Sequence, residues 1–211
     1  MSYSSLYGIK KDYTGEIISE YSNSWLFSPI VMSVLPDKYL PYEITTPYGF
    51  KKSIISGMDG GDLWRKTNQK INNCENTPDR ICWEMSNQQI FFTKDNKCIA
   101  DNIRQFVLNN STYDKSTEDG VSPLERDHII ERFNEIAKDI ETLDENEYPF
   151  FVFKNTSCDD GVERWFSKYN EDSEEYEDNS IKDADEFLAE FVVINDNKIT
   201  EFISNLKFEF V

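Results

Sequence analysis

The chain has 211 residues, of which 38% are hydrophobic and 14% aromatic, and its formal net charge is −18. Disordered acidic chains are poor in aromatic residues, so this composition predicts a folded protein with a buried core. The charge disfavours direct binding to nucleic acid, because the net field repels phosphate.

The first half of the chain is predicted to be mostly β-structure. Asp12 and Gly15 supply turn chemistry between two short apolar runs, which is typical of a hairpin. The most apolar segment, 25–35, is interrupted by Pro29 and is too short for the roughly 20 apolar residues of a membrane span. The expected elements are strands within 6–22, a buried segment at 25–35, a strand at 50–56, a helix at 62–71, a strand pair at 81–85 and 89–93, and a helix at 98–108.

The second half is predicted to open with a long helix. Ser122 is a helix cap, Pro123 suits the first helical position, and Glu125 completes a capping box. Apolar side chains then recur in steps of four and three to form one stripe: Ile129, Phe133, Ile136, Ile140 and Leu143. Further elements are expected as strands at 148–153, 192–194 and 206–211 and a short helix at 183–191, while 199–205 is compatible with helix or strand.

These patterns predict an α+β fold, with antiparallel strands and one long amphipathic helix at about 123–143 packed on a sheet. Residues 109–121 are polar and lie where the charge balance changes, so they are a candidate linker. We therefore expect a neutral, mostly β subdomain with short helices at 1–110 and an acidic α+β subdomain at 122–211. A single compact domain is the alternative.

The excess of acidic over basic residues lies entirely in the second half of the chain. Residues 1–100 hold 11 acidic and 11 basic residues, whereas residues 101–211 hold 29 acidic and 11 basic ones. Within the second half, acids recur every fourth residue along the predicted helix, at Asp127, Glu131, Glu135 and Asp139, which we call the helix row. Regularly spaced carboxylates attract the same Lys and Arg side chains that bind phosphate, although a solvated helix face is the alternative interpretation.

A second acidic segment lies between residues 159 and 190, which hold 13 acids and three bases. Acids interleaved with aromatic residues suit a surface that docks on a basic groove. The alternative is a solvated loop. The partner-binding residues predicted in this segment are Trp165, Glu171, Asp172, Glu174, Glu175, Tyr176, Glu177 and Asp178.

The sequence gives only weak signals for a calcium site, a zinc site or a catalytic site. Residues 114–125 resemble a calcium-binding loop, but the glycine falls at position seven, whereas such a loop needs it at position six. Cys74, Cys82, Cys98 and Cys158 have no zinc-type spacing, so reduced thiols of a cytoplasmic protein are expected. His128 is the only histidine, and no nucleophile motif accompanies it. We expect no cofactor, no metal and no enzymatic activity.

The leading hypothesis is a non-enzymatic inhibitor that binds a basic nucleic-acid-handling protein and occludes its nucleic-acid site. Lys outnumbers Arg 16 to 6 and only four residues are Ala, which is typical of AT-rich coding sequences. The hypothesis therefore places the protein among phage or mobile-element anti-defence factors of the anti-CRISPR or anti-restriction type, in a bacterial cytoplasm. The alternatives are an immunity protein against a basic nuclease toxin, an enzyme or metal-binding protein whose pocket leaves no motif, and a structural protein whose acidity serves only solubility.

Overall fold

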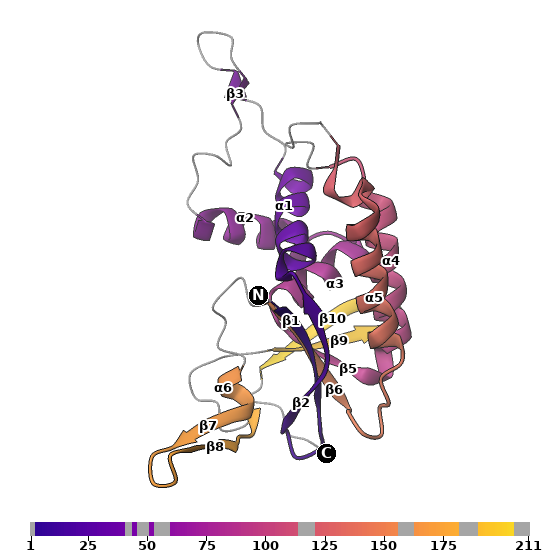
Figure 1. The fold of residues 1–211 in the computed structure, drawn as a ribbon. Coiled ribbons are helices and arrows are strands. Elements are labelled where there is room, and N and C mark those ends of the chain that lie inside the picture. The colour runs from indigo at the N-terminus through magenta and orange to yellow at the C-terminus, as the bar shows by residue number, and fades with distance from the viewer. Residues whose placement is uncertain are drawn as a thin grey trace.

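A six-stranded mixed sheet forms the centre of the protein (Figure 1), seen in a computed structural model that describes residues 3–40, 44–45, 51–52, 60–113, 121–155, 163–181 and 190–204. The strand order is β10-β9-β5-β6-β1-β2, with β5 and β9 parallel and the other neighbours antiparallel. Its strands are β1 (Tyr3–Ile9), β2 (Gly15–Ser22), β5 (Ile90–Phe92), β6 (Phe150–Asn155), β9 (Glu190–Asn195) and β10 (Lys198–Ser204).

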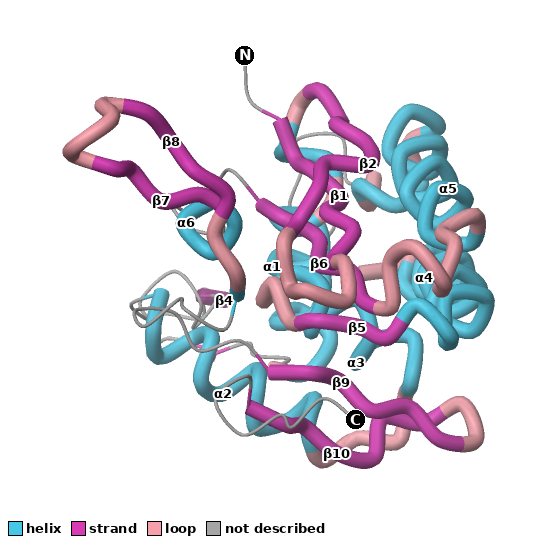
Figure 2. Tube along the Cα trace, turned by 90° about the horizontal axis from the view of Figure 1, so that it is seen from below, coloured by secondary structure: helices cyan, strands magenta, loops and turns pink. Residues whose placement is uncertain are grey.

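In the described part of the chain, five helices cover one face of this sheet, a short sixth helix packs on the other face, and two small ribbons project away from the sheet (Figures 1 and 2). The helices are α1 (Ser28–Tyr39), α2 (Gly60–Asn72), α3 (Thr77–Ser86), α4 (Asn96–Asn110), α5 (Asp127–Glu141) and the short α6 (Glu163–Phe166), with 3-10 turns η1 (Ser24–Leu26), η3 (Thr93–Asp95) and η4 (Pro123–Glu125). One ribbon pairs β3 (Ile44–Thr45) with β4 (Lys51–Lys52), and the other pairs β7 (Ser167–Asn170) with β8 (Glu175–Asp178).

The two faces of the sheet have separate cores, because alternate side chains of a strand point to opposite faces. Along β6, Phe151 and Phe153 pack with the helices α1 to α5, whereas Phe150 and Val152 pack with α6 and the β1–β2 turn. On the helical face, the ring of Phe133 stacks on that of Phe106 with centroids 5.8 Å apart. Burying each such ring contributes about 1.5–3 kcal/mol to folding.

The α+β class predicted from the sequence is confirmed, but the single long helix at 123–143 is divided. Ser122 caps the 3-10 turn η4 through the expected capping box with Glu125. Arg126 then has an extended backbone, and α5 begins at Asp127. Since α4 has 15 residues, as α5 does, α5 is not the one dominant helix.

The strand predicted at 81–85 is wrong, because residues 77–86 form α3. The side chain of Asn76 accepts a hydrogen bond from the Asp79 amide at 3.2 Å, which caps this helix, and Pro78 occupies its first turn. Short apolar runs fit both the helical and the strand period, and here the cap decides between them. The segment 199–205, which was open between helix and strand, contributes to strand β10.

Strands from both predicted subdomains alternate in the central sheet. β6 from the second half lies between β5 and β1 from the first half. The two halves of the chain therefore contribute to one sheet. Most of the predicted linker, most of the helix predicted at 183–191 and the strand at 206–211 lie outside the described residues. Among the described helices, none has the length and apolar character needed to cross a membrane.

Candidate partner-binding surfaces

Part of the predicted acidic loop is a β-hairpin, residues 167–178, which we call the hairpin arm. Its strands β7 and β8 pair from Ser167 opposite Asp178 to Asn170 opposite Glu175. Asn170 holds the turn, since its Oδ1 accepts the Asp172 amide at 2.9 Å and its Nδ2 donates to Glu177 Oε1 at 2.6 Å. Figure 1 shows the arm projecting from the lower left of the molecule, away from α4 and α5.

The base of the hairpin arm is fixed to the β1–β2 turn. Phe166 packs under this turn so closely that a Cβ at Gly15 would lie 2.5 Å from its ring. On the other side of the arm, the amide of Asn179 donates to the Phe166 carbonyl at 2.9 Å, and that of Ile181 donates to the Tyr13 carbonyl at 3.1 Å. A two-stranded hairpin is marginal on its own, so these contacts position the arm.

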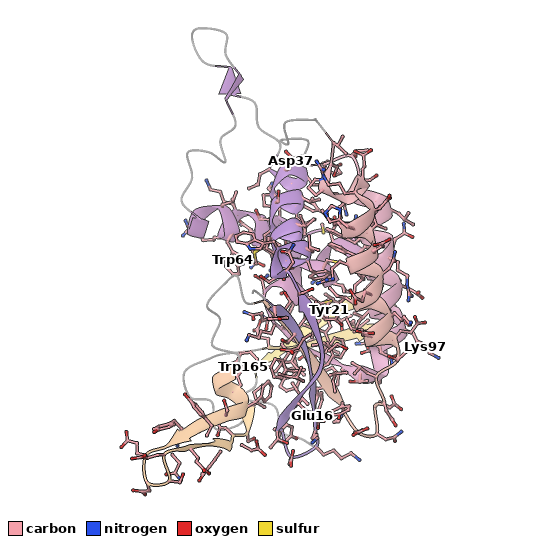
Figure 3. All side chains as sticks on the ribbon, viewed as in Figure 1. Glu16, Tyr21, Asp37, Trp64, Lys97 and Trp165 are labelled. Atoms are coloured by element: carbon pink, nitrogen blue, oxygen red, sulfur yellow. The ribbon has the colours of Figure 1, made fainter. Side chains whose placement is uncertain are left out.

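Trp165 belongs to this base and not to the exposed surface predicted for it. Its side chain is 4% exposed and packs in the second core with Phe166 and Phe150. Figure 3 shows Trp165 at the root of the arm, next to the sheet. Trp165 is therefore corrected from a partner contact to an anchor, because the large apolar indole gains more from burial than from solvent.

The charged residues predicted on the hairpin arm are all exposed. Residues 167–178 carry six acids and one base, Lys168. Lys168 lies opposite Glu177, whereas Tyr169 lies opposite Tyr176 on the other face of the ribbon. The exposed carboxylates are those of Glu171, Asp172, Glu174, Glu175, Glu177 and Asp178.

The helix row is partly occupied by contacts within the protein. Asp127, Glu131 and Glu135 are exposed, but Asp139 is half-buried and accepts a hydrogen bond from the Tyr21 hydroxyl at 2.8 Å. Burial and this bond raise the pKa of Tyr21. Arg132 contacts Glu135 at 2.9 Å and also donates to the Ser22 carbonyl at 2.7 Å. Two of the four acids in the row therefore help to fasten α5 to β2.

The helix row and the hairpin arm do not form one surface. α5 packs on the face of the sheet that holds Phe151 and Phe153, whereas α6 packs on the face that holds Phe150 and Val152. Figures 1 and 2 both place the arm and α5 on opposite sides of the molecule. A flat binding site on a partner can therefore contact one of them at a time.

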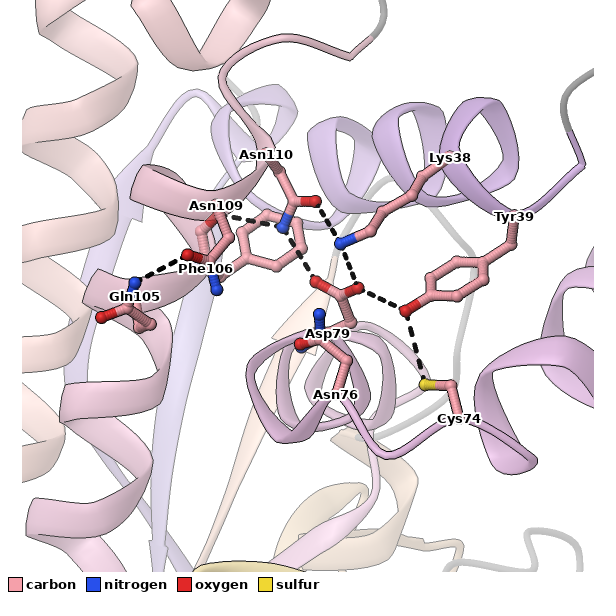
Figure 4. A network of polar contacts seen from close by, with 9 residues as sticks. All are labelled: Lys38, Tyr39, Cys74, Asn76, Asp79, Gln105, Phe106, Asn109 and Asn110. Atoms are coloured by element: carbon pink, nitrogen blue, oxygen red, sulfur yellow. Dashed lines mark hydrogen bonds and ion pairs between the residues drawn. The ribbon is translucent and has the colours of Figure 1, made fainter.

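A buried polar network joins α1, α3 and α4 (Figure 4), and nothing in the sequence indicated it. The Lys38 ammonium lies 2.6 Å from Asp79 Oδ2 and 2.8 Å from Asn110 Oδ1. Asn110 donates to the other Asp79 oxygen at 2.8 Å, and the Tyr39 hydroxyl donates to Oδ2 at 2.6 Å. Every oxygen of the fully buried Asp79 carboxylate is thus paired, as a structural network requires.

Cys74 lies at the edge of this network, with its sulfur 3.4 Å from the Tyr39 hydroxyl. Burial and the bond to Asp79 raise the pKa of Tyr39. A tyrosine held in its neutral form donates a hydrogen bond but is a poor base. The arrangement therefore stabilises helix packing, with Tyr39 as a hydrogen-bond donor.

A pocket of about 430 Å³ lies between the start of α4 and the β9–β10 turn. It is lined in part by Asp95, Cys98, Asn102 and Asn197. The Cys98 thiol donates to Asn197 Oδ1 at 2.9 Å, and burial together with the Asp95 carboxylate raises its pKa. A nucleophilic cysteine needs a lowered pKa, so this environment disfavours thiolate chemistry at Cys98.

The remaining candidates are not brought together. His128 is exposed in the first turn of α5. Cys74, Cys82 and Cys98 are free thiols, and Cys158 lies outside the described residues. Most of the calcium-like loop also lies outside them, while Ser122 and Glu125 are engaged in the capping box. Within the described ranges, no group of three or more His, Cys, Asp or Glu side chains is placed to hold a metal ion.

No protein-family model matches the sequence, and neither a curated protein nor a solved structure is significantly similar to it.

Proposed function

We propose that the protein is a non-enzymatic inhibitor that inserts the hairpin arm into the nucleic-acid site of a basic target protein. The observation that carries the proposal is the exposure of all six carboxylates on an arm that projects from the body. Carboxylates at the tip and along β8 meet the target first, and the anchored base keeps them in place. The helix row lies on the other side of the molecule and is a secondary surface at most.

The spacing of charge on the arm suits this role. A β-strand rises about 3.4 Å per residue. Each strand of duplex DNA carries one phosphate per roughly 3.4 Å of helix axis. Because alternate residues of a strand share a face, Glu175 and Glu177 of β8 lie about 7 Å apart, which corresponds to two phosphate intervals, so Lys and Arg side chains arranged for alternate phosphates find a carboxylate at each position. Such a nucleic-acid mimic binds fast at low salt and weakens as salt increases.

The biological setting proposed is phage or mobile-element anti-defence, of the anti-CRISPR or anti-restriction type, in the cytoplasm of a low-GC bacterium. It is supported by the excess of Lys over Arg and the scarcity of Ala in the sequence. An immunity protein against a basic nuclease toxin uses the same electrostatics, and the identity of the captured target separates the two.

The test compares two variants of equal net charge. Glu175→Gln/Glu177→Gln/Asp178→Asn neutralises three acids of the arm. Asp127→Asn/Glu131→Gln/Glu135→Gln neutralises three acids of the helix row. Tagged proteins are used to capture targets from a low-GC host lysate at about 50 mM and 500 mM salt, the range over which phosphate-like contacts weaken strongly. The target identified is then assayed for binding to labelled nucleic acid.

We expect the wild type to capture a basic protein at low salt and to displace its nucleic acid. The arm variant should lose this competition, whereas the helix-row variant should retain most of it. If both variants lose it equally, net charge acts without a site. If the captured protein still binds nucleic acid in the presence of the wild type, occlusion is wrong.

A further inference from the structure

The hairpin arm carries an aromatic pair that its own folding does not bury. Tyr169 and Tyr176 are directly opposite each other in the β7–β8 register. Their ring centroids are 5.3 Å apart and the rings are inclined at 63°. The two side chains are 49% and 74% exposed, in contrast to the buried aromatic anchors at the base of the arm. Large apolar groups exposed together at the centre of a projecting surface are typical of a binding contact.

The strand alternation sorts the charges of the arm by face. Lys168 and Glu177 share one face, so the single base of the arm is on that side. Tyr169, Tyr176 and Asp178 share the other face, and Asp178 is two residues from Tyr176 on the same strand. Within the described arm, the aromatic face therefore combines ring surfaces with a carboxylate and carries no cationic side chain of its own.

We propose that this aromatic face is a docking site for an arginine side chain of the basic partner. The guanidinium stacks on the exposed ring of Tyr176 and pairs with the Asp178 carboxylate. This inference rests on the proposed function, because it takes the partner to be basic, and it adds the residue type that the partner presents. Charge complementarity selects this occupant: a second copy of the chain brings another acidic arm, and nucleic acid brings phosphates, so both are repelled.

Arginine fits this face better than lysine for three physical reasons. Its guanidinium is planar and stacks on an aromatic ring, and it is more weakly hydrated than an ammonium group. Its donors also form a fork that matches a carboxylate. Cation–π attraction strengthens with desolvation, which the arrival of a partner groove supplies. The acids of the arm attract either cation, but the tyrosine pair distinguishes between them.

The experiment uses two labelled peptides as probes, nine arginines and nine lysines, which have equal charge and length. Their binding to the full chain is followed by fluorescence anisotropy at about 50 mM salt, where charge contacts are weakly screened. We expect the wild type to bind the arginine peptide about 3–10-fold more tightly, in line with one stacked cation. Tyr169→Leu/Tyr176→Leu should remove this preference while the affinity for the lysine peptide stays nearly the same. Tyr169→Phe/Tyr176→Phe keeps both rings and should retain it.

A second variant keeps the test valid if the leucine variant disturbs the hairpin. Asp178→Asn leaves both rings in place and should reduce the arginine preference, whereas Glu177→Gln removes the same charge from the opposite face and should not. Equal affinity of the wild type for the two peptides overturns the arginine site but leaves the proposed function standing. A preference for the arginine peptide that persists in Tyr169→Leu/Tyr176→Leu likewise overturns the arginine site and leaves the proposed function standing. Failure of the wild type to bind either peptide in a salt-dependent way overturns the proposed function itself.

Discussion

Glu84 gives a sharp test of the energetics of the core, because it is a carboxyl group that the fold keeps protonated. It lies on α3 and its side chain is 4% exposed. Burial raises its pKa from the ordinary 4.5 to about 8, against the opposing effect of Arg80 and with a smaller contribution from Glu190. The Glu84→Gln variant keeps the size of the side chain but removes the ionisation.

The direction of the effect follows from linkage. Below pH 4.5 the carboxyl is protonated in both states, so its contribution to stability is fully present. Between pH 4.5 and 8 the unfolded chain releases the proton while the folded protein holds it, so stability falls as the pH rises. The slope is about 1.4 kcal/mol per pH unit, which amounts to a loss of about 3 kcal/mol by pH 7. Glu84→Gln does not suffer this loss.

The assay is urea unfolding of the wild type and the variant at pH 5.5, 6.5 and 7.5. All three pH values lie above the sequence pI of 4.4. The difference in unfolding free energy between Glu84→Gln and the wild type should increase by about 1.4 kcal/mol at each step, in favour of the variant. In a thermal scan at pH 7.5, where the accumulated difference is about 4 kcal/mol, the midpoint temperature of the variant should be higher by about 8–16 °C. An advantage that stays constant across the three pH values refutes the reasoning, since it shows that Glu84 does not change protonation on unfolding in this range.

Two further substitutions test the packing around the helices and the arm. Lys38→Met leaves the buried Asp79 charge without its cation and should reduce the unfolding free energy measured in urea by about 3–5 kcal/mol. The double variant Lys38→Met/Asp79→Leu removes both charges and should recover part of this loss. No recovery in the double variant contradicts the charge argument. Gly15→Ala places a Cβ 2.5 Å from the Phe166 ring and should reduce the unfolding free energy by about 1–3 kcal/mol in the same measurement. Adding Phe166→Leu to Gly15→Ala should recover part of that loss, and no recovery contradicts the steric argument.

The elements that could be predicted are those whose local signals agree. The β1–β2 hairpin combines apolar runs with Asp12 and Gly15 at its turn, and β6 begins with an apolar run that contains three phenylalanines. α3 was missed because Ile81 and Met85 fit either period, and only Asn76 and its hydrogen bond favour the helix. Short-range patterns determine an element when period, turn and cap all agree.

The hairpin arm was missed because acidic residues are depleted in strands. Asn170, which closes the turn, and the two tyrosines are the local signals that could have indicated it. The anchoring of its base to Gly15 is a tertiary contact, and no pattern near residue 167 carries it. The Lys38–Asp79–Asn110 network was inaccessible for the same reason, because Lys38 is 41 and 72 positions from its partners.

The distribution of charge over the two faces of the sheet bears on what a partner can recognise. Spacing in the sequence made the helix row the more regular feature, but its third and fourth acids contact Arg132 and Tyr21. A charge engaged within the protein has less to offer a partner, because breaking its bond offsets the new contact. The hairpin arm has less regular spacing but carries exposed acids beside exposed rings. Recognition of the proposed basic partner should therefore depend on the arm, and in the same proposal the helix row adds to the long-range attraction between the two proteins.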